Sequence, residues 1–430
     1  MRVLITGANG FIGAHIVARL LEQGHAVVAA VRAPDRIRRR FPTIDAVHCD
    51  LNRDVAADAW LPRLAGVDAV VNCAGALQAG GGQNLDAIHH RAPAALFDAC
   101  AQAGVRTVVH ISAISADPAA GTDYARSKAA GEASLKTRDL DWVILRPSLV
   151  YAEGSYGGTS LLRALAALPL LTPLPGRGDQ LFQPIHARDL AETVAACLSR
   201  RDLAGSVLEP VGPEPLTVKD ILAKLRAWLG YRAAPCLPVP MPVIAGLARV
   251  GDLFGAGPVR TTTVRQMLHG NAGDPAPFIA ATGLSPRTMD AALSASPAGT
   301  QDRWHARLFF LDPLLRVALA AFWIWTGVTA LMRPPRADAL ALLELIGLNA
   351  ALIAPTVWFA AALDIGLGAW LLVARSVKRP ALAMLAVGMA YLAAFSVVSP
   401  TLWLDPYGAL SKIPVILVAT LVLMVLGEDR

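Results

Sequence analysis

Two residues four positions apart, Tyr124 and Lys128, have the types and spacing needed for acid–base chemistry. If this stretch is helical, both side chains lie on one face and can act together. A phenol has a pKa of about 10, and a neighbouring ammonium makes its anion more accessible. Such a pair can donate a proton to a carbonyl oxygen as a hydride arrives at the carbon, or remove the proton in reverse. The spacing alone is common, so its meaning depends on the elements that position it.

A glycine-rich turn follows the apolar run Val3–Thr6 and opens a helical pattern. Glycines at this spacing allow a tight turn, let the backbone approach a pyrophosphate, and let the helix pack closely on the strand. The helix N-terminus then faces the phosphate charge. The segment predicts a dinucleotide site, to which we expect Gly7, Asn9, Gly10, Phe11, Ile12 and Gly13 to contribute.

An arginine, Arg32, follows the second apolar run at the position where NAD-selective enzymes usually carry an acid for the ribose hydroxyls. A guanidinium suits the additional phosphate of NADP through bidentate charge-assisted bonds. We therefore expect NADP(H) to be the preferred cofactor, with NAD(H) as the alternative. The three arginines at 38–40 are interpreted as part of a solvated loop.

Short apolar runs alternate with helical patterns over the first part of the chain. The runs are Val3–Thr6, Ala26–Val31, Ala69–Ala74, Thr107–Ser112 and Trp142–Arg146. Near-continuous apolar strands separated by helices predict an α/β fold with a doubly wound parallel Rossmann sheet covered on both faces. This domain is expected over 1–297, with a small substrate lobe mostly at 147–297. Within it, helices are predicted at Ala187–Ser199 and Thr217–Leu229, separated by a loop at Gly205–Pro215.

The composition changes after a linker predicted at 298–306. Over the whole chain, hydrophobic residues make up 54% and charged residues 17%, which is low for a soluble protein. Apolar spans follow at Pro313–Met332, Pro355–Ala374, Pro380–Val398 and Ile413–Leu426. The first three are near the ~20 residues that cross a bilayer. We therefore expect an α-helical bundle of about four transmembrane helices over 307–430, with an interfacial or re-entrant segment at Leu340–Ala354.

Basic residues and cysteines predict where the protein resides. Arginine and lysine flank the first span and fill the loop 375–379, which places the N-terminal domain on the cytoplasmic face of the inner membrane. Strand-like residues from Arg2 onward argue against a signal peptide. The five scattered cysteines fit a reducing compartment without disulfides or a metal site. A net charge of +6 without a dense basic face argues against nucleic acid as a partner.

One acidic residue, Asp364, lies within an otherwise apolar span. An ionisable group is costly in that position and by default suggests function. The alternative is a protonated or helix-paired carboxyl that only helps packing, and the sequence favours neither.

The N-terminal part resembles an extended or atypical short-chain dehydrogenase/reductase. Besides the glycine turn, Tyr124 and Lys128, the resemblance is carried by Asp50-Leu51, Asn72-Cys73-Ala74-Gly75, His110-Ile111-Ser112, Arg146-Pro147-Ser148-Leu149-Val150-Tyr151, and Pro184-Ile185-His186-Ala187-Arg188-Asp189-Leu190-Ala191. It implies a Ser–Tyr–Lys group, with Asp50 near the adenine and Ala74 and Gly75 lining the cofactor. Leu51 and Pro147 are expected at the same site, and Lys128 on the nicotinamide ribose. The serine is either Ser112 or Ser115.

The C-terminal part resembles a DoxX-like membrane domain. Most of that resemblance lies in Pro400-Thr401-Leu402-Trp403-Leu404-Asp405-Pro406-Tyr407-Gly408 and Ser411-Lys412-Ile413-Pro414.

Three functions fit these observations. The first is a membrane-anchored NADP(H)-dependent oxidoreductase acting on a carbonyl- or quinone-like small molecule. Anchoring of the enzyme to a lipid bilayer favours a lipidic substrate. The second is an epimerase or dehydratase of nucleotide-sugars, as in extended relatives. The third is a non-catalytic NADP(H)-binding module that stabilises the membrane bundle or senses for it, which would bind cofactor but be indifferent to loss of Tyr124.

Overall fold

The computed structural model describes residues 1–78, 82, 84–254, 260–269, 271–332, 350–408 and 410–428. Internal contacts divide the chain into two units, Met1–Ala306 and Arg307–Arg430, which are described separately.

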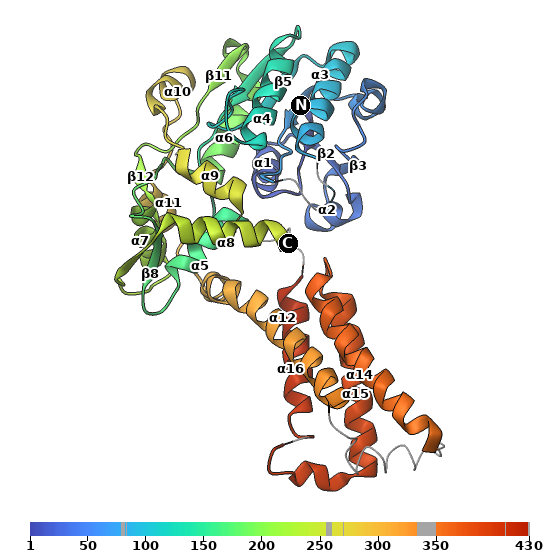
Figure 1. Cartoon of the computed structure of the whole chain (residues 1–430). Helices are drawn as coiled ribbons and strands as arrows, with labels where there is room; N and C mark the ends of the chain where they lie inside the picture. The colour runs from blue at the N-terminus through green and yellow to red at the C-terminus, as the bar shows by residue number, and fades with distance from the viewer. Residues whose placement is uncertain are drawn as a thin grey trace. The chain divides into compact units, whose positions relative to one another are not determined.

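A seven-stranded sheet forms the centre of the first unit (Figure 1). Its strands are β1 (Arg2–Thr6), β2 (Ala26–Val31), β3 (Asp45–His48), β4 (Ala69–Asn72), β5 (Thr107–Ile111), β6 (Asp141–Leu145) and β11 (Ser206–Leu208). They run in the order β11-β6-β5-β4-β1-β2-β3, and every neighbouring pair is parallel. The order reverses between β1 and β4, where doubly wound sheets bind ligands at the carboxyl ends of their strands. The predicted doubly wound parallel sheet is confirmed.

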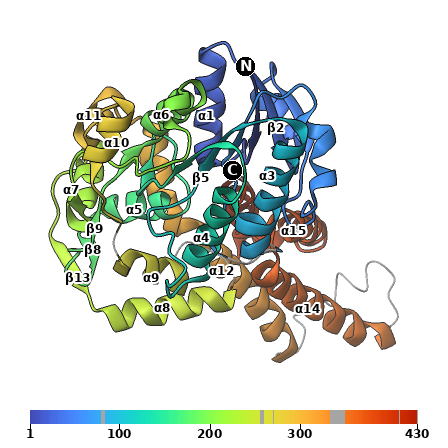
Figure 2. The ribbon, with the colours of Figure 1, turned by 90° about the horizontal axis from the view of Figure 1, so that it is seen from above.

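Helices cover both faces of this sheet (Figure 2). Alternate residues of each strand point to opposite faces, so Val3 and Ile5 join one core and Leu4 joins the other. The helices α1 (Phe11–Glu22) and α6 (Ala187–Ser199) cover the first face, and α3 (Ala92–Ala103) and α4 (Asp123–Lys136) cover the second. A short helix, α2 (Pro34–Arg40), joins β2 to β3.

Two of the seven strands were absent from the predicted runs. β3 has only one fully buried residue because it is an edge strand, and β11 has only three residues. β11 also lies inside the segment Gly205–Pro215, so the prediction of a loop is wrong for its three residues. The helix predicted at Ala187–Ser199 is confirmed as α6. Residues 187–208 therefore belong to the main sheet and its cover, and they interrupt the lobe expected at 147–297.

The remaining lobe contains three two-stranded sheets. These pair β7 (Val150–Tyr151) with β10 (Ile185–His186), β9 (Leu181–Phe182) with β12 (Leu216–Thr217), and β8 (Thr172–Pro175) with β13 (Cys236–Val239). Its helices are α5 (Gly158–Ala166), α7 (Val218–Trp228), α8 (Met241–Phe254), α9 (Thr261–His269) and α11 (Met289–Ala295), whereas Phe278 of α10 (Pro275–Thr282) packs in the first core of the main sheet. Helix α7 begins with a capping box between Thr217 and Asp220, the signal that predicts its start.

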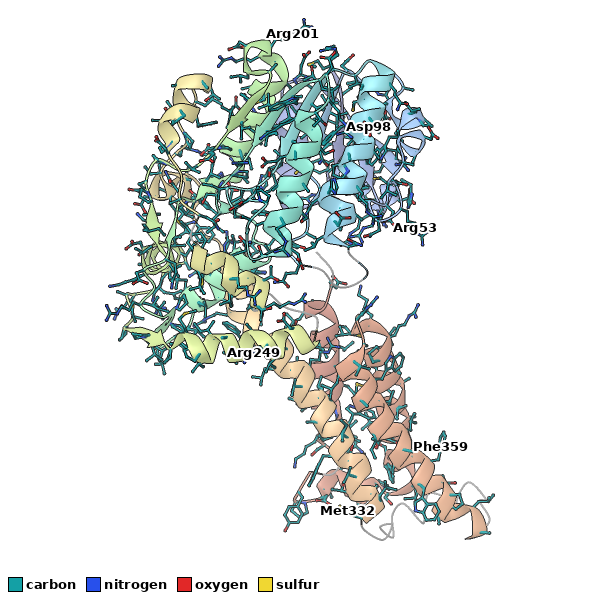
Figure 3. All side chains as sticks on the ribbon, turned by 45° about the horizontal axis from the view of Figure 1, so that its top comes forward. Arg53, Asp98, Arg201, Arg249, Met332 and Phe359 are labelled. Carbon is teal, nitrogen blue, oxygen red and sulfur yellow. The ribbon has the colours of Figure 1, made fainter. Side chains whose placement is uncertain are left out.

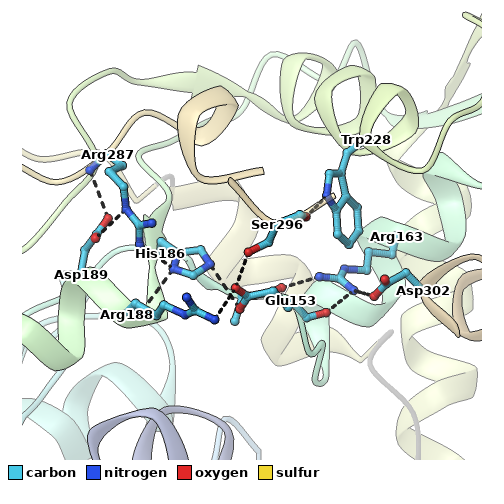
Figure 4. A network of polar contacts seen from close by, with 10 residues as sticks. Glu153, Arg163, His186, Arg188, Asp189, Trp228, Arg287, Ser296 and Asp302 are labelled. Carbon is cyan, nitrogen blue, oxygen red and sulfur yellow. Dashed lines mark hydrogen bonds and ion pairs between the residues drawn. The ribbon is translucent and has the colours of Figure 1, made fainter. Parts of the chain in front are cut away.

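A polar network joins the lobe to the segment after α11 (Figure 4). The Glu153 carboxylate accepts a hydrogen bond from Ser296 (2.7 Å), and the buried Arg163 donates to the Glu153 carbonyl (2.7 Å) and pairs with Asp302 (3.3 Å). The indole of Trp228 donates to the Ser296 carbonyl (2.7 Å). Most of the linker expected at 298–306 is therefore ordered, and α12 (Thr300–Met332) already includes residues 300–306.

The second unit consists of apolar helices. Within the described residues, three are long and apolar enough to cross a membrane: α12, α14 (Ala350–Val373) and α15 (Lys378–Val398). The fourth, α16 (Ile413–Leu426), is shorter, so a bundle of about four spans stays a prediction. Residues 340–349 of the segment predicted to be interfacial, Leu340–Ala354, lie outside the described residues.

Small residues bring α12 and α14 together. A Cβ atom on Gly327 would lie 2.5 Å from the Ala361 carbonyl oxygen, and one on Gly368 would lie 2.7 Å from that of Ala320. Close backbone approach at small residues is the usual packing of transmembrane helices. Arg316 donates to the Leu371 carbonyl (2.8 Å) near the end of α14, where a cation compensates the helix dipole.

Candidate active site

The turn between β1 and α1 has the geometry of a phosphate cradle. Gly7 has φ +68°, and a Cβ there would lie 2.8 Å from the Ala74 Cα. A Cβ on Gly13 would collide with the Gly7 carbonyl oxygen, so both positions require glycine. No described side chain caps α1 at Gly10, and its first turn holds no acid. The free N–H groups of this helix end therefore fit the pyrophosphate of a dinucleotide.

Buried hydrogen bonds tie the ends of β1, β4 and β5 together at the switch point. Thr6 Oγ1 donates to Asn72 Oδ1 (2.6 Å) and accepts from the Ala74 N–H (3.3 Å). Asn72 Nδ2 donates to His110 Nδ1 (2.9 Å). Burial lowers the pKa of His110 to about 3, so the ring is neutral with its proton on Nε2. This chain of bonds places Ala74 and Gly75 beside the glycine turn.

Lys128 lies at the meeting point of β4, β5 and α4. Its side chain is buried, and Nζ donates to the Ile111 carbonyl at the end of β5 (2.9 Å). A Cβ on Gly75 would lie 3.3 Å from the same Nζ. Burial lowers the pKa of Lys128 to about 8, and the charge of Glu132 opposes that shift. The predicted cofactor-lining segment after β4 and the predicted lysine are thus neighbours.

Tyr124 lies one turn before Lys128 on α4, as the spacing predicts, and it is half-buried. Burial raises the pKa of its phenol to about 12. This direction is opposite to the lowering that the neighbouring ammonium predicts, because burial of the phenol is the cause of the shift. The phenol is therefore protonated at neutral pH, which is the form that can donate a proton.

A buried histidine, His89, supports Tyr124. Its Nε2 accepts from the Ala76 N–H (3.1 Å), so the proton is on Nδ1, which bonds Ser127 Oγ (2.8 Å). Ser127 Oγ in turn donates to the Tyr124 carbonyl (3.0 Å). The His89 ring packs edge-on against the Tyr124 ring at 5.5 Å between centroids. Burial lowers the pKa of His89 to about 2, so the ring stays neutral.

The backbone around His89 is packed closely against Gly131 of α4. His89 lies in a π-helical turn, Ala87–Arg91, a conformation frequent at functional sites. A Cβ on Gly131 would collide with the His89 carbonyl oxygen. The glycine three residues after Lys128 therefore allows α4 to approach this turn.

The two candidate serines have different surroundings. Ser112 is buried, and its hydroxyl donates to the Glu132 carboxylate (2.5 Å), which is also paired with Arg146 (2.6 Å). Ser115 is half-buried in the turn after β5, and no described residue hydrogen-bonds its hydroxyl. Pro147 is buried beside this turn, where its carbonyl accepts from the Ile114 N–H (3.2 Å).

The residues expected near the adenosine half lie after β2 and β3. Arg32 is exposed at the end of β2, and no described residue pairs with it. Asp50 is half-buried, and its carboxylate accepts from the Asn52 N–H (3.1 Å), while Leu51 packs on the second core. The three arginines at 38–40, expected in a solvated loop, belong instead to helix α2, where Arg38 donates to the Ala46 carbonyl (2.7 Å).

In the second unit, Asp364 has a defined partner. Its side chain is buried between helices, and the Tyr391 hydroxyl on α15 donates to Asp364 Oδ1 (3.2 Å). Among the described residues, no group of three or more His, Cys, Asp or Glu could hold a metal ion.

Comparison with known families matches both parts of the chain. Residues 7–201 match the NAD(P)H-binding family, and residues 320–421 match the DoxX-like family. The predicted NAD(P)-binding domain and DoxX-like domain are thereby confirmed.

Individual relatives match the first unit. A ceramide reductase of Caulobacter vibrioides is 29% identical over 280 residues, covering 62% of this chain and 84% of the relative. A protein of Haloferax volcanii named as a probable low-salt glycan biosynthesis reductase is 30% identical over 229 residues, covering 46% of this chain and 71% of the relative. An uncharacterised Mycobacterium tuberculosis protein is 27% identical over 255 residues, covering 59% of this chain, but the chain spans only 26% of its length.

A solved structure has the same fold. MoeE5 in complex with UDP-glucuronic acid and NAD superposes with a TM-score of 0.52 at 22% identity, covering 71% of this chain and 99% of MoeE5. The protein thus belongs to the NAD(P)H-binding Rossmann-type family, with short-chain dehydrogenase/reductase-like relatives, and carries a DoxX-like domain at its C-terminal end.

Proposed function

We propose that this protein is a membrane-anchored, NADP(H)-dependent oxidoreductase that reduces a carbonyl group on a lipidic or quinone-like substrate. The observation that carries the proposal is the Tyr124 phenol one turn from Lys128, at the strand ends that face the glycine cradle. Similarity to a ceramide reductase supports both the reductive direction and a lipidic substrate.

In this mechanism the residues around β5 handle the proton. The chemistry that bound NADPH supplies is hydride donation to the carbonyl carbon. Tyr124 donates its phenolic proton to the carbonyl oxygen, and the Ser115 hydroxyl orients that oxygen. Lys128 binds the ribose and stabilises the phenolate that remains on Tyr124. His89 and Ser127 hold the Tyr124 backbone and ring in place.

The proposal is tested with the purified full chain in detergent. Long-chain ketones, ceramide-type lipids and quinones are offered with NADPH, and NADPH oxidation is followed together with the reduced product. We expect at least one class to be reduced, with one product formed for each NADPH consumed. Tight NADPH binding without oxidation by any class would instead support a structural cofactor.

The two serines give a matched pair of variants. Ser115→Ala removes the hydroxyl proposed to orient the carbonyl, so we expect turnover to fall with little change in folding. Ser112→Ala leaves the buried Glu132 without one hydrogen-bond donor, which costs about 1–3 kcal/mol of folding stability. Melting temperature and turnover are measured for both variants. The reverse pattern, with turnover lost only in Ser112→Ala, would reassign the role to Ser112.

We also propose that the first unit faces the cytoplasm at the inner membrane. The apolar helices and basic loops support this placement. Alkaline carbonate washing is expected to leave the protein in the membrane pellet. A protease added to intact spheroplasts is expected to leave the first unit uncut, whereas release by carbonate or cleavage from outside would contradict the placement.

For Asp364 we propose a role in function and not only in packing. Asp364→Asn keeps size and the hydrogen bond to Tyr391 but removes the titration. We expect activity in membranes to change across pH while the melting temperature stays close to that of the unmodified protein. If activity and stability are both unchanged across pH, the packing interpretation is correct.

A further inference from the structure

We propose that the surface formed by β13 and the outer face of α8, residues 236–250, contacts the bilayer and brings a lipidic substrate to Tyr124. Delivery of the substrate to Tyr124 rests on the proposed function. Contact of the surface with the bilayer follows from the exposure and charge of its own residues. We call this region the β13–α8 surface.

An apolar stripe runs along the exposed side of α8. Val243, Leu247 and Val250 recur at helical spacing with exposed fractions of 51%, 57% and 49%. Leu237 on β13 continues the stripe at 48%, whereas Ala248 on the opposite side of α8 is completely buried. Contiguous apolar patches of this kind are rare on soluble surfaces and mark interaction sites.

The charges around the stripe fit an anionic lipid surface. No residue between Asp220 and Asp252 is acidic, and the exposed Arg232 and Arg249 stand at either end of the surface. Figure 3 labels Arg249, which is carried by α8 itself. Helices with an exposed apolar face and basic neighbours lie in the membrane interface, where arginine meets anionic headgroups.

The occupant is inferred to be lipid because of the rest of the chain. Three helices long and apolar enough to cross a membrane follow in the same polypeptide, so a bilayer is always within reach of the first unit. A protein partner docking on this surface would need acidic residues to face Arg232 and Arg249, whereas anionic phospholipid supplies that charge everywhere along the membrane.

The position of α9 links this surface to the candidate active site. Helix α9 lies between α8 and α4 in both views (Figures 1 and 2), and it contacts α8. Gln266 on α9 donates to Thr122 Oγ1 (2.5 Å), the residue that caps α4 two positions before Tyr124. Thr263 on α9 accepts from Gln78 (2.5 Å), which follows β4 and the segment that lines the cofactor site. Helix α9 therefore joins α8 to two segments that flank the site.

A native cysteine permits a direct test on the full chain. Cys236 is exposed on the β13–α8 surface, whereas Cys49, Cys100 and Cys197 are buried and Cys73 is half-buried. Cys236 is labelled with a fluorescent maleimide, and the protein is placed in nanodiscs of anionic phospholipid with or without bromine on the acyl chains. The control label is on the exposed position 201, in a Cys236→Ser, Arg201→Cys variant, which Figure 3 locates on the sheet-containing part of the unit.

We expect brominated lipid to reduce emission from the Cys236 label and to leave the label at 201 nearly unchanged. Val243→Glu with Leu247→Glu should abolish that loss, while Val55→Glu, at an exposed valine in the loop after β3, should not. Equal quenching of both labels, or none, overturns the proposal. A label that is not quenched by lipid but changes its emission when a second copy of the protein is present also overturns the proposal. That result identifies the surface as a site of self-association.

Turnover separates this inference from the proposed function. The double glutamate variant should raise KM for a lipid presented in the bilayer and leave kcat/KM for a short, water-soluble carbonyl substrate unchanged. Lipid quenching without any turnover would retain the surface but reject the proposed function. A KM for the bilayer lipid that equals the KM of the unmodified protein, or an equal loss of kcat/KM on both substrates, would reject the delivery of substrate through this surface.

Discussion

Replacing Tyr124 by phenylalanine is expected to lower turnover by about 10²–10⁴-fold, the usual contribution of a positioned proton donor. The change removes one oxygen and keeps the ring that packs edge-on against His89. Cofactor affinity and melting temperature should therefore change little. Turnover is measured as NADPH oxidation on the best substrate of the carbonyl and quinone panel, and affinity as fluorescence of bound NADPH.

Replacing Lys128 by methionine is expected to damage both turnover and cofactor binding, because the amine serves the phenol and the ribose together. The asymmetry between the two variants separates a catalytic site from a cofactor-binding module. Normal turnover by Tyr124→Phe on the substrate found would remove the phenol from the mechanism.

The same lysine predicts a pH dependence. Burial lowers the pKa of Lys128 to about 8, so the ammonium is present below that pH and is lost as the pH rises through it. Turnover in the reductive direction should accordingly fall above about pH 8. An unchanged rate up to pH 10, where Tyr124 is still protonated, would show that the ammonium is not required.

Replacing Arg32 by aspartate is expected to weaken NADPH binding by roughly ten- to a hundredfold, with a much smaller effect on NADH. Loss of a charge-assisted contact to the 2′-phosphate costs about 1.5–3 kcal/mol, and the introduced acid suits the ribose hydroxyls of NAD. Both dissociation constants are measured by fluorescence titration.

Arg39→Asp is the matched control, because Arg39 is an exposed arginine on the neighbouring helix α2 and its replacement changes charge identically. It should alter binding of both cofactors only slightly. Equal affinity of the unmodified protein for NADPH and NADH would contradict the assigned preference.

The sheet and its glycine turn were accessible from the sequence because local pattern dictates them. Continuous apolar runs identify central parallel strands buried on both faces, and Gly7 and Gly13 mark positions where a Cβ would collide with backbone. The edge strand β11 was not predicted, because three residues are too few to show an alternating apolar pattern. Its place is determined by pairing with β6, which is distant in the sequence.

The surroundings of the candidate site were less predictable. The distance in sequence between His89 and Ser127, or Ser112 and Glu132, gives no sign that these side chains meet, since only the packing of α4 joins them. The pKa of Tyr124 shows the same limit. Spacing predicts a favourable neighbouring charge, but the depth of burial determines the direction of the shift.

Isotope labelling tests hydride transfer from NADPH to the carbonyl carbon most directly. The full chain is incubated with NADPH carrying deuterium at the transferable C4 position and with the substrate identified in the panel, and the product is analysed by mass spectrometry. We expect one deuterium on the former carbonyl carbon for each NADP⁺ formed. A product without deuterium, or NADPH that remains bound and unoxidised, would contradict it.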